Sequence, residues 1–228
     1  MSDPQKGDET LAERYLRVLL EARRREATDL ILGAVQRGET DVRRVYLEVF
    51  EPVLREVGRL WLANQISIAQ EHFISATTQL VMSRLYPHIF TTQRRGLQMV
   101  AACAGPELHE IGLRMVADFF ELEGWDTYYL GANLPADAIV AAVAERKADL
   151  LAISATMPRH IPFVREVIHS LRTDEAMRST TVLVGGGAFA REAQWRAVGA
   201  DGCARSAADA VALAEELCAG KPHARETP

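Results

Sequence analysis

A histidine between two carboxylates stands in the segment Glu107-Leu108-His109-Glu110-Ile111-Gly112. The segment follows the apolar run of residues 97–103, which predicts a buried strand, and precedes a pattern that is typical of a helix. In an open parallel sheet, ligands bind beyond the carboxyl ends of the strands. An imidazole there is a common metal ligand, and Gly112 lets a bulky group approach the backbone. The segment therefore predicts that His109 offers its ring to a large ligand, the alternative being a solvated or capping histidine.

Small and hydroxyl-bearing residues follow two other predicted strands. Ser154 and Thr156 come at the end of residues 150–154, and Gly186 and Gly187 follow residues 181–184. The glycines suit either a tight turn or the close approach of a phosphate or nucleotide tail. Ser154 likewise suits either a strand end that bonds local backbone or a ligand contact. The order of these loops along the chain favours one shared site.

The second part of the chain alternates between short apolar runs and helical patterns. We predict strands at residues 97–102, 127–130, 150–154, 181–184 and 202–204, and helices at residues 111–122, 135–146, 163–172, 190–198 and 207–218. Such alternation predicts a doubly wound, Rossmann-like sheet of five parallel strands. The carboxyl ends of these strands bring the loops described above to the same edge.

The first part of the chain shows only helical spacing. Leu11, Tyr15 and Leu19 share one helix face, and Pro52 indicates a helix boundary nearby. Ser67 and Gln70 form a capping-box pattern at the start of a long helix. These features predict a bundle of four or five helices. The expected domains are a helical bundle over residues 9–92 and an α/β domain over residues 96–220.

Composition narrows the possible functions. The 228 residues carry a formal net charge of -5, with 48% hydrophobic residues, so no broad basic field favours nucleic-acid binding. No apolar run is long enough for a membrane helix, and no signal peptide opens the chain, so we expect a cytoplasmic protein without membrane contact. The three cysteines lack paired metal-ligand spacing, which predicts structural thiols.

The loop motifs together resemble the cobalamin-binding domain of methionine synthase, corrinoid methyl carriers and cobalamin-dependent mutases, over about residues 97–220. The resemblance implies that His109 is the lower cobalt ligand. It further implies that the cavity for the nucleotide tail of the cofactor is lined by Gly112, Ser154, Thr156, Gly186 and Gly187. Most members have aspartate where this chain has Glu107, and either carboxylate fixes the histidine tautomer. The glutamate variant is typical of cobalamin photoreceptors.

A second motif lies in the helical part. Trp61, followed ten residues later by Glu71 and His72, resembles the motif of CarH-type photoreceptors. This resemblance implies that the tryptophan covers an adenosyl group and that the Glu-His pair contacts it. The alternatives are a core aromatic for Trp61 and a favourable first-turn charge for Glu71. Leu62 stands where some photoreceptors have a cobalt-binding histidine, which leaves His72 or water for that position.

These resemblances predict a non-enzymatic light sensor. Photolysis of adenosylcobalamin, leaving hydroxocobalamin, would repack the helices and change association with a protein partner or a second copy of the chain. Because only about ten residues precede Leu11, we expect no helix-turn-helix and no direct binding of nucleic acid. The arginine-rich segment from Arg14 to Arg25 offers a face for partners.

Two other functions stay open beside the light sensor. The main alternative is a corrinoid methyl carrier of a methyltransferase system, whereas a mutase subunit is disfavoured because the chain has no barrel-sized domain. Domains of this architecture resemble AerR-type antirepressors, which bind cobalamin and act on a transcription factor, and photocobilin-type sensors, which add a bilin chromophore. The second resemblance implies a noncovalent bilin near Tyr128, Arg159 and His160, the alternative being that these residues form solvated surface.

Overall fold

The computed structural model describes residues 9–90 and 92–219. The chain forms two compact units that divide between Ile89 and Phe90. The expected domains, residues 9–92 and 96–220, include residues 91 and 220, which lie outside the described residues, and their exact limits stay a prediction. Within the described residues, no helix combines the length and the apolar character that crossing a membrane requires.

Helices make up the first unit. They are α1 (Leu11–Leu20), α2 (Arg24–Gln36), α3 (Val42–Arg44), a π-helical segment (Val45–Phe50), α4 (Glu51–Leu62), α5 (Ile68–Leu85) and a 3-10 turn (Tyr86–His88). The predicted capping box is present, because the Ser67 hydroxyl accepts from the Gln70 amide and the Gln70 side chain accepts from the Ser67 amide. Pro52 is the second residue of α4, which continues directly from the π-helical segment, so the proline lies inside a continuous helical run and marks the change from π to α geometry instead of the predicted helix boundary.

The core of the first unit contains an aromatic cluster. Tyr15 and Phe50 are fully buried with ring centroids 5.6 Å apart, and Tyr46 lies 5.4 Å from Phe50. The Tyr15 hydroxyl shares a 3.3 Å hydrogen bond with the hydroxyl of Thr78 on α5. This bond satisfies the one polar atom that burial of the tyrosine would otherwise leave unpaired.

The second unit is built on a sheet of five parallel strands, as predicted. Its strands are β1 (Gln98–Cys103), β2 (Asp126–Gly131), β3 (Leu150–Ser154), β4 (Thr181–Gly185) and β5 (Gly202–Ala204). They lie in the order β2-β1-β3-β4-β5, and every neighbouring pair is parallel. The central strands are almost wholly apolar because helices cover both faces of the sheet.

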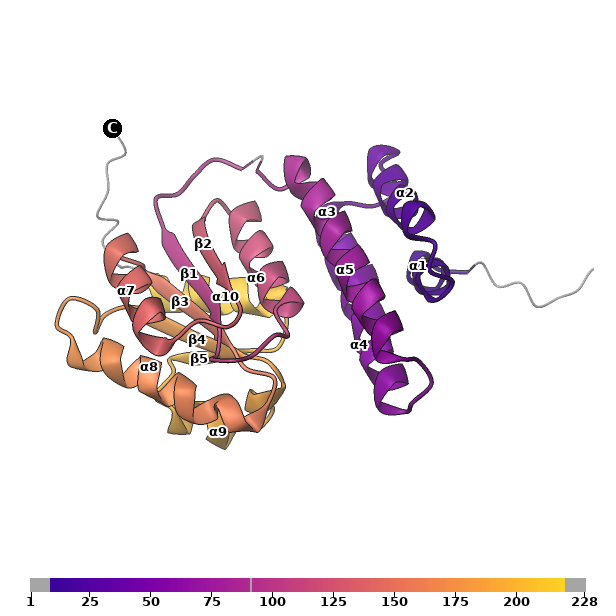
Figure 1. The fold of residues 1–228 in the computed structure, drawn as a ribbon. Coiled ribbons are helices and arrows are strands. Elements are labelled where there is room, and N and C mark those ends of the chain that lie inside the picture. Colours follow the sequence, from indigo (N-terminus) through magenta and orange to yellow (C-terminus); the bar gives the residue numbers. More distant parts are fainter. Residues whose placement is uncertain (1–8, 91, 220–228) are drawn as a thin grey trace, which may run out of the picture. The chain divides into compact units, whose positions relative to one another are not determined.

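The covering helices are α6 (Ile111–Leu122), α7 (Ala136–Arg146), α8 (Ile161–Thr173), α9 (Glu192–Ala197) and α10 (Ala207–Cys218). Helices α7 and α8 cover one face, and α6 and α10 cover the other (Figure 1). Alternate residues of each strand point to the two layers. Val100 packs in the α7–α8 layer, and Met99 and Ala101 pack in the α6–α10 layer.

The order of the strands places a topological switch point at the carboxyl edge of the sheet. The chain moves from β1 to β2 on one side and then from β3 onward on the other, so the topological switch lies between β1 and β3. Loops that leave the carboxyl ends of strands at a switch point diverge and leave room for a ligand. The loop after β1 holds Glu107 and His109, and the loop after β3 holds Thr156 and His160.

Candidate functional site

The Glu107 carboxylate joins the two loops at the switch point. Glu107 is only 1% exposed. One oxygen, Oε1, accepts a hydrogen bond from Nδ1 of His109 and weaker ones from the amides of Leu108 and His109. The other oxygen, Oε2, accepts from the Thr156 amide at 2.9 Å and pairs with Nδ1 of His160 at 3.1 Å. Glu107 thus ties the loop after β1 to the loop after β3.

These donors determine the charge of Glu107. Burial by itself would raise the pKa of the carboxyl, but the bonds from the His109 ring and from the Thr156 and His109 amides outweigh it and hold the pKa at about 2. Glu107 is therefore ionised at neutral pH. Because an ionised carboxylate only accepts hydrogen bonds, both histidines present a protonated Nδ1 to it.

His109 leaves its second ring nitrogen available for a ligand. Its side chain is 65% exposed, although Nδ1 is held by Glu107. A carboxylate on one nitrogen fixes the tautomer and makes the other, Nε2, the metal-binding atom. Among the described residues, no group of three or more His, Cys, Asp and Glu side chains is placed to hold a metal ion. A single imidazole is a ligand that a metal held in a macrocycle can take from a protein.

His160 is a part of this site whose role the sequence analysis missed. The residue is 4% exposed, and its Nε2 accepts a 3.3 Å bond from Nε of Arg159 while Nδ1 faces Glu107. The sequence separates His160 from Glu107 by 53 positions, and only the parallel pairing of β1 with β3 brings them together. Tyr128, the third residue of the expected bilin contact beside Arg159 and His160, lies under the Arg146 guanidinium, whose carbon is 3.9 Å from the ring centroid.

The structure also brings together the serine, threonine and glycines of the predicted tail cavity. Gly186 has φ of +89°, and a Cβ there would lie 2.4 Å from the Ala155 carbonyl oxygen and 3.0 Å from the Ser154 hydroxyl. A Cβ on Gly187 would lie 3.2 Å from the Thr156 carbonyl oxygen. Backbone packing between the loops after β3 and β4 is thus sufficient to require glycine at position 186.

Gly112 differs from these glycines. It lies in the first turn of α6, and a Cβ there would meet no atom within 4 Å. No packing within the unit therefore requires a glycine, and the space beside this turn is open. A glycine next to open space, on the helix that follows the His109 loop, fits the approach of a large cofactor to the backbone.

The predicted residues of the helical part lie at exposed positions of the first unit. Trp61, near the end of α4, is 44% exposed, so it is not a core aromatic. Glu71, in the first turn of α5, accepts from the Ser75 hydroxyl at 2.7 Å, and its other oxygen lies 2.7 Å from Nδ1 of His72. The His72 side chain is 71% exposed. Their role toward a cofactor stays a prediction.

Comparisons with known proteins cover both units. Profiles described as B12 binding domain match residues 97–214 and residues 11–86. The chain is 28% identical over 198 residues to "Dimethylamine corrinoid protein 1" of Methanosarcina acetivorans, which covers 84% of this chain and 91% of that protein.

Two solved structures share the fold. The monomethylamine corrinoid protein of Methanosarcina barkeri superposes with a TM-score of 0.81 at 20% identity, covering 91% of this chain and 98% of that one. A chain of the methanol:cobalamin methyltransferase complex from Methanosarcina barkeri gives a TM-score of 0.51 at 21% identity, covering 94% of this chain and 81% of that one.

The prediction of a cobalamin-dependent light sensor is wrong. A protein that resembles this chain over most of both lengths is named as a dimethylamine corrinoid protein, not as a photoreceptor. These comparisons give no support to adenosylcobalamin or a bilin as the cofactor. The motif of Trp61, Glu71 and His72 does not identify a light sensor, because a short motif does not distinguish proteins that share the same two-part architecture.

Proposed function

Because this chain belongs to the B12 binding domain family, we propose that it is a corrinoid protein that carries a methyl group between protein partners. The observation that carries the proposal is the similarity to a dimethylamine corrinoid protein, which extends over 84% of this chain and 91% of that protein. The Glu107–His109 pair at the switch point of the sheet supplies the chemistry that such a role requires. The methyl-transfer catalysts in this proposal are the partners.

We assign the lower face of the corrinoid to three residues. His109 would bind the metal through Nε2, Glu107 would hold the ring in that orientation, and His160 would hold Glu107. When bound, the corrinoid supplies a cobalt centre that accepts and gives up a methyl group. The buried, ionised Glu107 accepts from Nδ1 of His109, which leaves Nε2 as the nitrogen available for the metal.

The other proposed cofactor contacts come from the loops of the sheet unit and from the motif of the helical unit. Gly112 would let the cofactor approach α6, where the structure has open space. Ser154, Thr156, Gly186 and Gly187 would line the cavity for its tail. Trp61, Glu71 and His72 are kept as proposed contacts of the helical unit, now toward a corrinoid that carries a methyl group instead of an adenosyl group.

Reconstitution tests the proposal. The apoprotein is titrated with methylcobalamin and with hydroxocobalamin, and absorbance spectra are recorded for the wild type and for His109→Ala. We expect both cofactors to bind and the wild-type spectra to show an imidazole from the protein as lower ligand. The variant should lose that signature in both forms, since Ala has no nitrogen to replace Nε2.

A labelled methyl group separates a carrier from a passive cofactor-binding protein. The hydroxocobalamin-loaded protein is reduced with titanium(III) citrate, treated with 13C-methyl iodide, freed of excess reagent and then offered a thiol. A carrier takes up the label and releases it over repeated cycles when a methyltransferase partner is present, and retains it when the thiol alone is offered. Failure to bind either cofactor, or retention of the label in the presence of methyltransferase partners and thiol, would refute the proposed function.

A further inference from the structure

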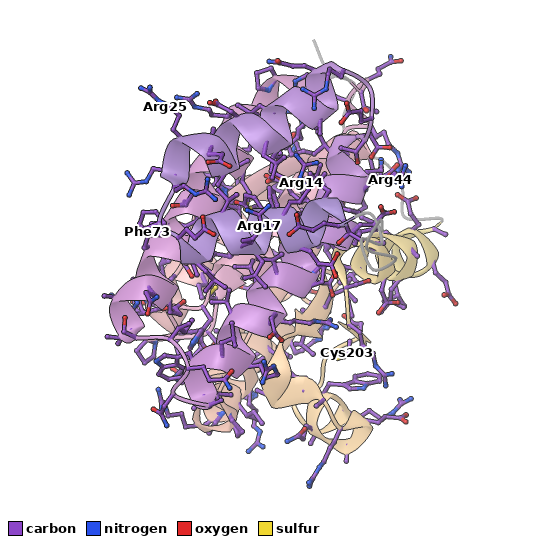
Figure 2. All side chains as sticks on the ribbon, turned by 90° about the vertical axis from the view of Figure 1, so that its right-hand side faces the viewer. Arg14, Arg17, Arg25, Arg44, Phe73 and Cys203 are labelled. Atoms are coloured by element: carbon purple, nitrogen blue, oxygen red, sulfur yellow. The ribbon has the colours of Figure 1, made fainter. Side chains whose placement is uncertain are left out.

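An arginine-lined cleft lies on the helical unit. Its volume is about 730 Å³, and it is formed by α1, α2 and the turn between them. The lining contains the guanidinium groups of Arg14, Arg17, Arg23, Arg24, Arg25 and Arg37. We call this feature the arginine cleft. Figure 2 shows Arg14, Arg17 and Arg25 on the face of the helical unit that is turned toward the viewer.

Charge in the arginine cleft is opposite to that of the whole chain. Its lining holds six arginines and two acidic residues, Glu26 and Asp29, whereas the chain has a formal net charge of -5. In the ranges that the structure describes, carboxylates pair with three of these arginines, Arg17, Arg23 and Arg37, and leave the charges of the other three unpaired. Arg14 and Arg17 are three residues apart on one helix, a spacing at which like charges repel. Such a concentration of positive charge raises the local concentration of anions.

Some of these arginines already bind carboxylates. Arg17 holds Glu9 through two parallel bonds of 2.9 and 3.0 Å, and Arg37 holds Glu39 through bonds of 2.6 and 3.1 Å. Both pairs have the planar, two-point geometry that a guanidinium forms with a carboxylate. Arginines of the cleft therefore already bind carboxylates within the chain itself.

Other guanidinium groups of the cleft are available for a partner. Within the part of the chain that the structure describes, Arg14 and Arg25 form no ion pair within 4 Å, and both are exposed. Arg24 lies over the ring of Phe73, 5.3 Å from its centroid, which leaves its charge unneutralised. These three groups provide positive charge in a recess whose lining also includes the apolar residues Val18 and Leu30.

We propose that the arginine cleft is a docking site for a glutamate- or aspartate-rich segment of a protein partner. Spaced carboxylates on such a segment would pair with Arg14, Arg24 and Arg25 while avoiding Glu26 and Asp29. A compact polyphosphate would concentrate its charge at one place and meet these acidic residues, so a segment with spaced charges is the better match. The inference rests on the proposed function only for the identity of the partner, which would be a protein that exchanges the methyl group.

A labelled acidic peptide tests this inference without any corrinoid. Binding of a fluorescein-labelled peptide of eight glutamates to the full chain is followed by fluorescence anisotropy at 20 and 200 mM NaCl. We expect saturable binding at low salt that weakens as salt rises. The double variant Arg14→Gln/Arg25→Gln should lose affinity by about fivefold or more, because each exposed charged contact contributes up to about 1 kcal/mol.

A matched variant on another helix controls for overall charge. Arg55→Gln/Arg59→Gln on α4 also removes two positive charges, but from positions outside the cleft. This variant should change the affinity for the peptide by less than about twofold. The variant Arg14→Lys/Arg25→Lys keeps the charges without the planar fork and should bind more weakly than wild type but more tightly than the glutamine variant. Circular dichroism confirms that each variant remains helical.

Three outcomes would overturn the inference. Equal losses of peptide affinity in both glutamine variants would indicate that binding responds to net charge alone. Absence of peptide binding at 20 mM NaCl would show that the cleft is not a docking site for acidic segments. Complete displacement of the peptide by micromolar tripolyphosphate would assign the cleft to phosphates. Because none of these measurements involves a corrinoid, failure here leaves the spectral test of His109 unaffected, and failure of that test leaves peptide binding unaffected.

Discussion

Replacing Glu107 by glutamine should destabilise the apoprotein because the glutamate lies at the centre of a buried network. Glutamine keeps the shape but has an NH2 group in place of one oxygen. In either orientation of the side-chain amide, the NH2 group faces ring or backbone N–H groups whose hydrogen bonds the carboxylate accepts in the wild type. Glu107→Gln therefore removes a charge and leaves buried donors without an acceptor.

The structure allows the magnitude to be worked in two ways. Holding the Glu107 pKa at about 2, against an ordinary value of 4.5, corresponds to about 3 kcal/mol of folding stability at neutral pH. The loss of one or two hydrogen bonds to a charged group, at about 1.5 to 3 kcal/mol each, gives a similar figure. We expect Glu107→Gln to lower the free energy of unfolding by about 3 kcal/mol.

The sign of the pH dependence follows from the lowered pKa. The folded carboxyl loses its proton more readily than the unfolded one, so the stabilisation is complete above about pH 4.5 and disappears as pH falls toward 2. Glutamine does not titrate. The difference in stability between wild type and Glu107→Gln should therefore shrink over this range.

Urea unfolding of the apoprotein at several pH values measures this difference. Glu145→Gln, at an exposed position on α7, is the control and should change stability by less than about 0.5 kcal/mol. Hydrogen exchange gives a local reading, because the Thr156 amide should exchange faster without its 2.9 Å acceptor. The reasoning would be refuted if Glu107→Gln were as stable as the control at pH 7. It would also be refuted if the difference in unfolding free energy between wild type and Glu107→Gln did not change with pH.

Further substitutions probe the other parts of the site. Gly186→Ala should cost about 2 kcal/mol or more in urea unfolding, since φ is +89° and the methyl group would meet backbone atoms. Gly112→Ala should leave the apoprotein equally or slightly more stable but weaken methylcobalamin binding by calorimetry, and unchanged affinity would remove Gly112 from the cavity. Trp61→Ala should cost less than about 1 kcal/mol because the residue is 44% exposed, whereas Trp125→Ala at a fully buried position should cost about 3 to 5 kcal/mol; similar losses would contradict the assigned burial. His160→Leu should cost about 1 to 3 kcal/mol by leaving the carboxylate without this donor, and His160→Gln should recover part of it; a fully stable leucine variant would argue against the network.

The sequence by itself determined the architecture, because the signals that specify it are local. Alternation of apolar runs with helical patterns predicted all five strands within one or two residues of their observed ends. The capping box at Ser67 and Gln70 defined the start of α5 in the same way. The His109 loop also followed from local order, since a loop after the first strand of a parallel sheet has only one edge to occupy.

The contacts within the site were decided by the tertiary structure. His160 reaches Glu107 only because β1 and β3 are neighbours, and no local pattern marks that pairing. The sequence showed three adjacent glycines but not that Gly186 is required by the Ala155 carbonyl while Gly112 faces open space. The charges of α1 and α2 likewise became a cleft only when the two helices packed together. Side-chain environment depends on residues distant in the chain, which is why sequence periodicity determines the elements and tertiary packing decides what each functional residue contacts.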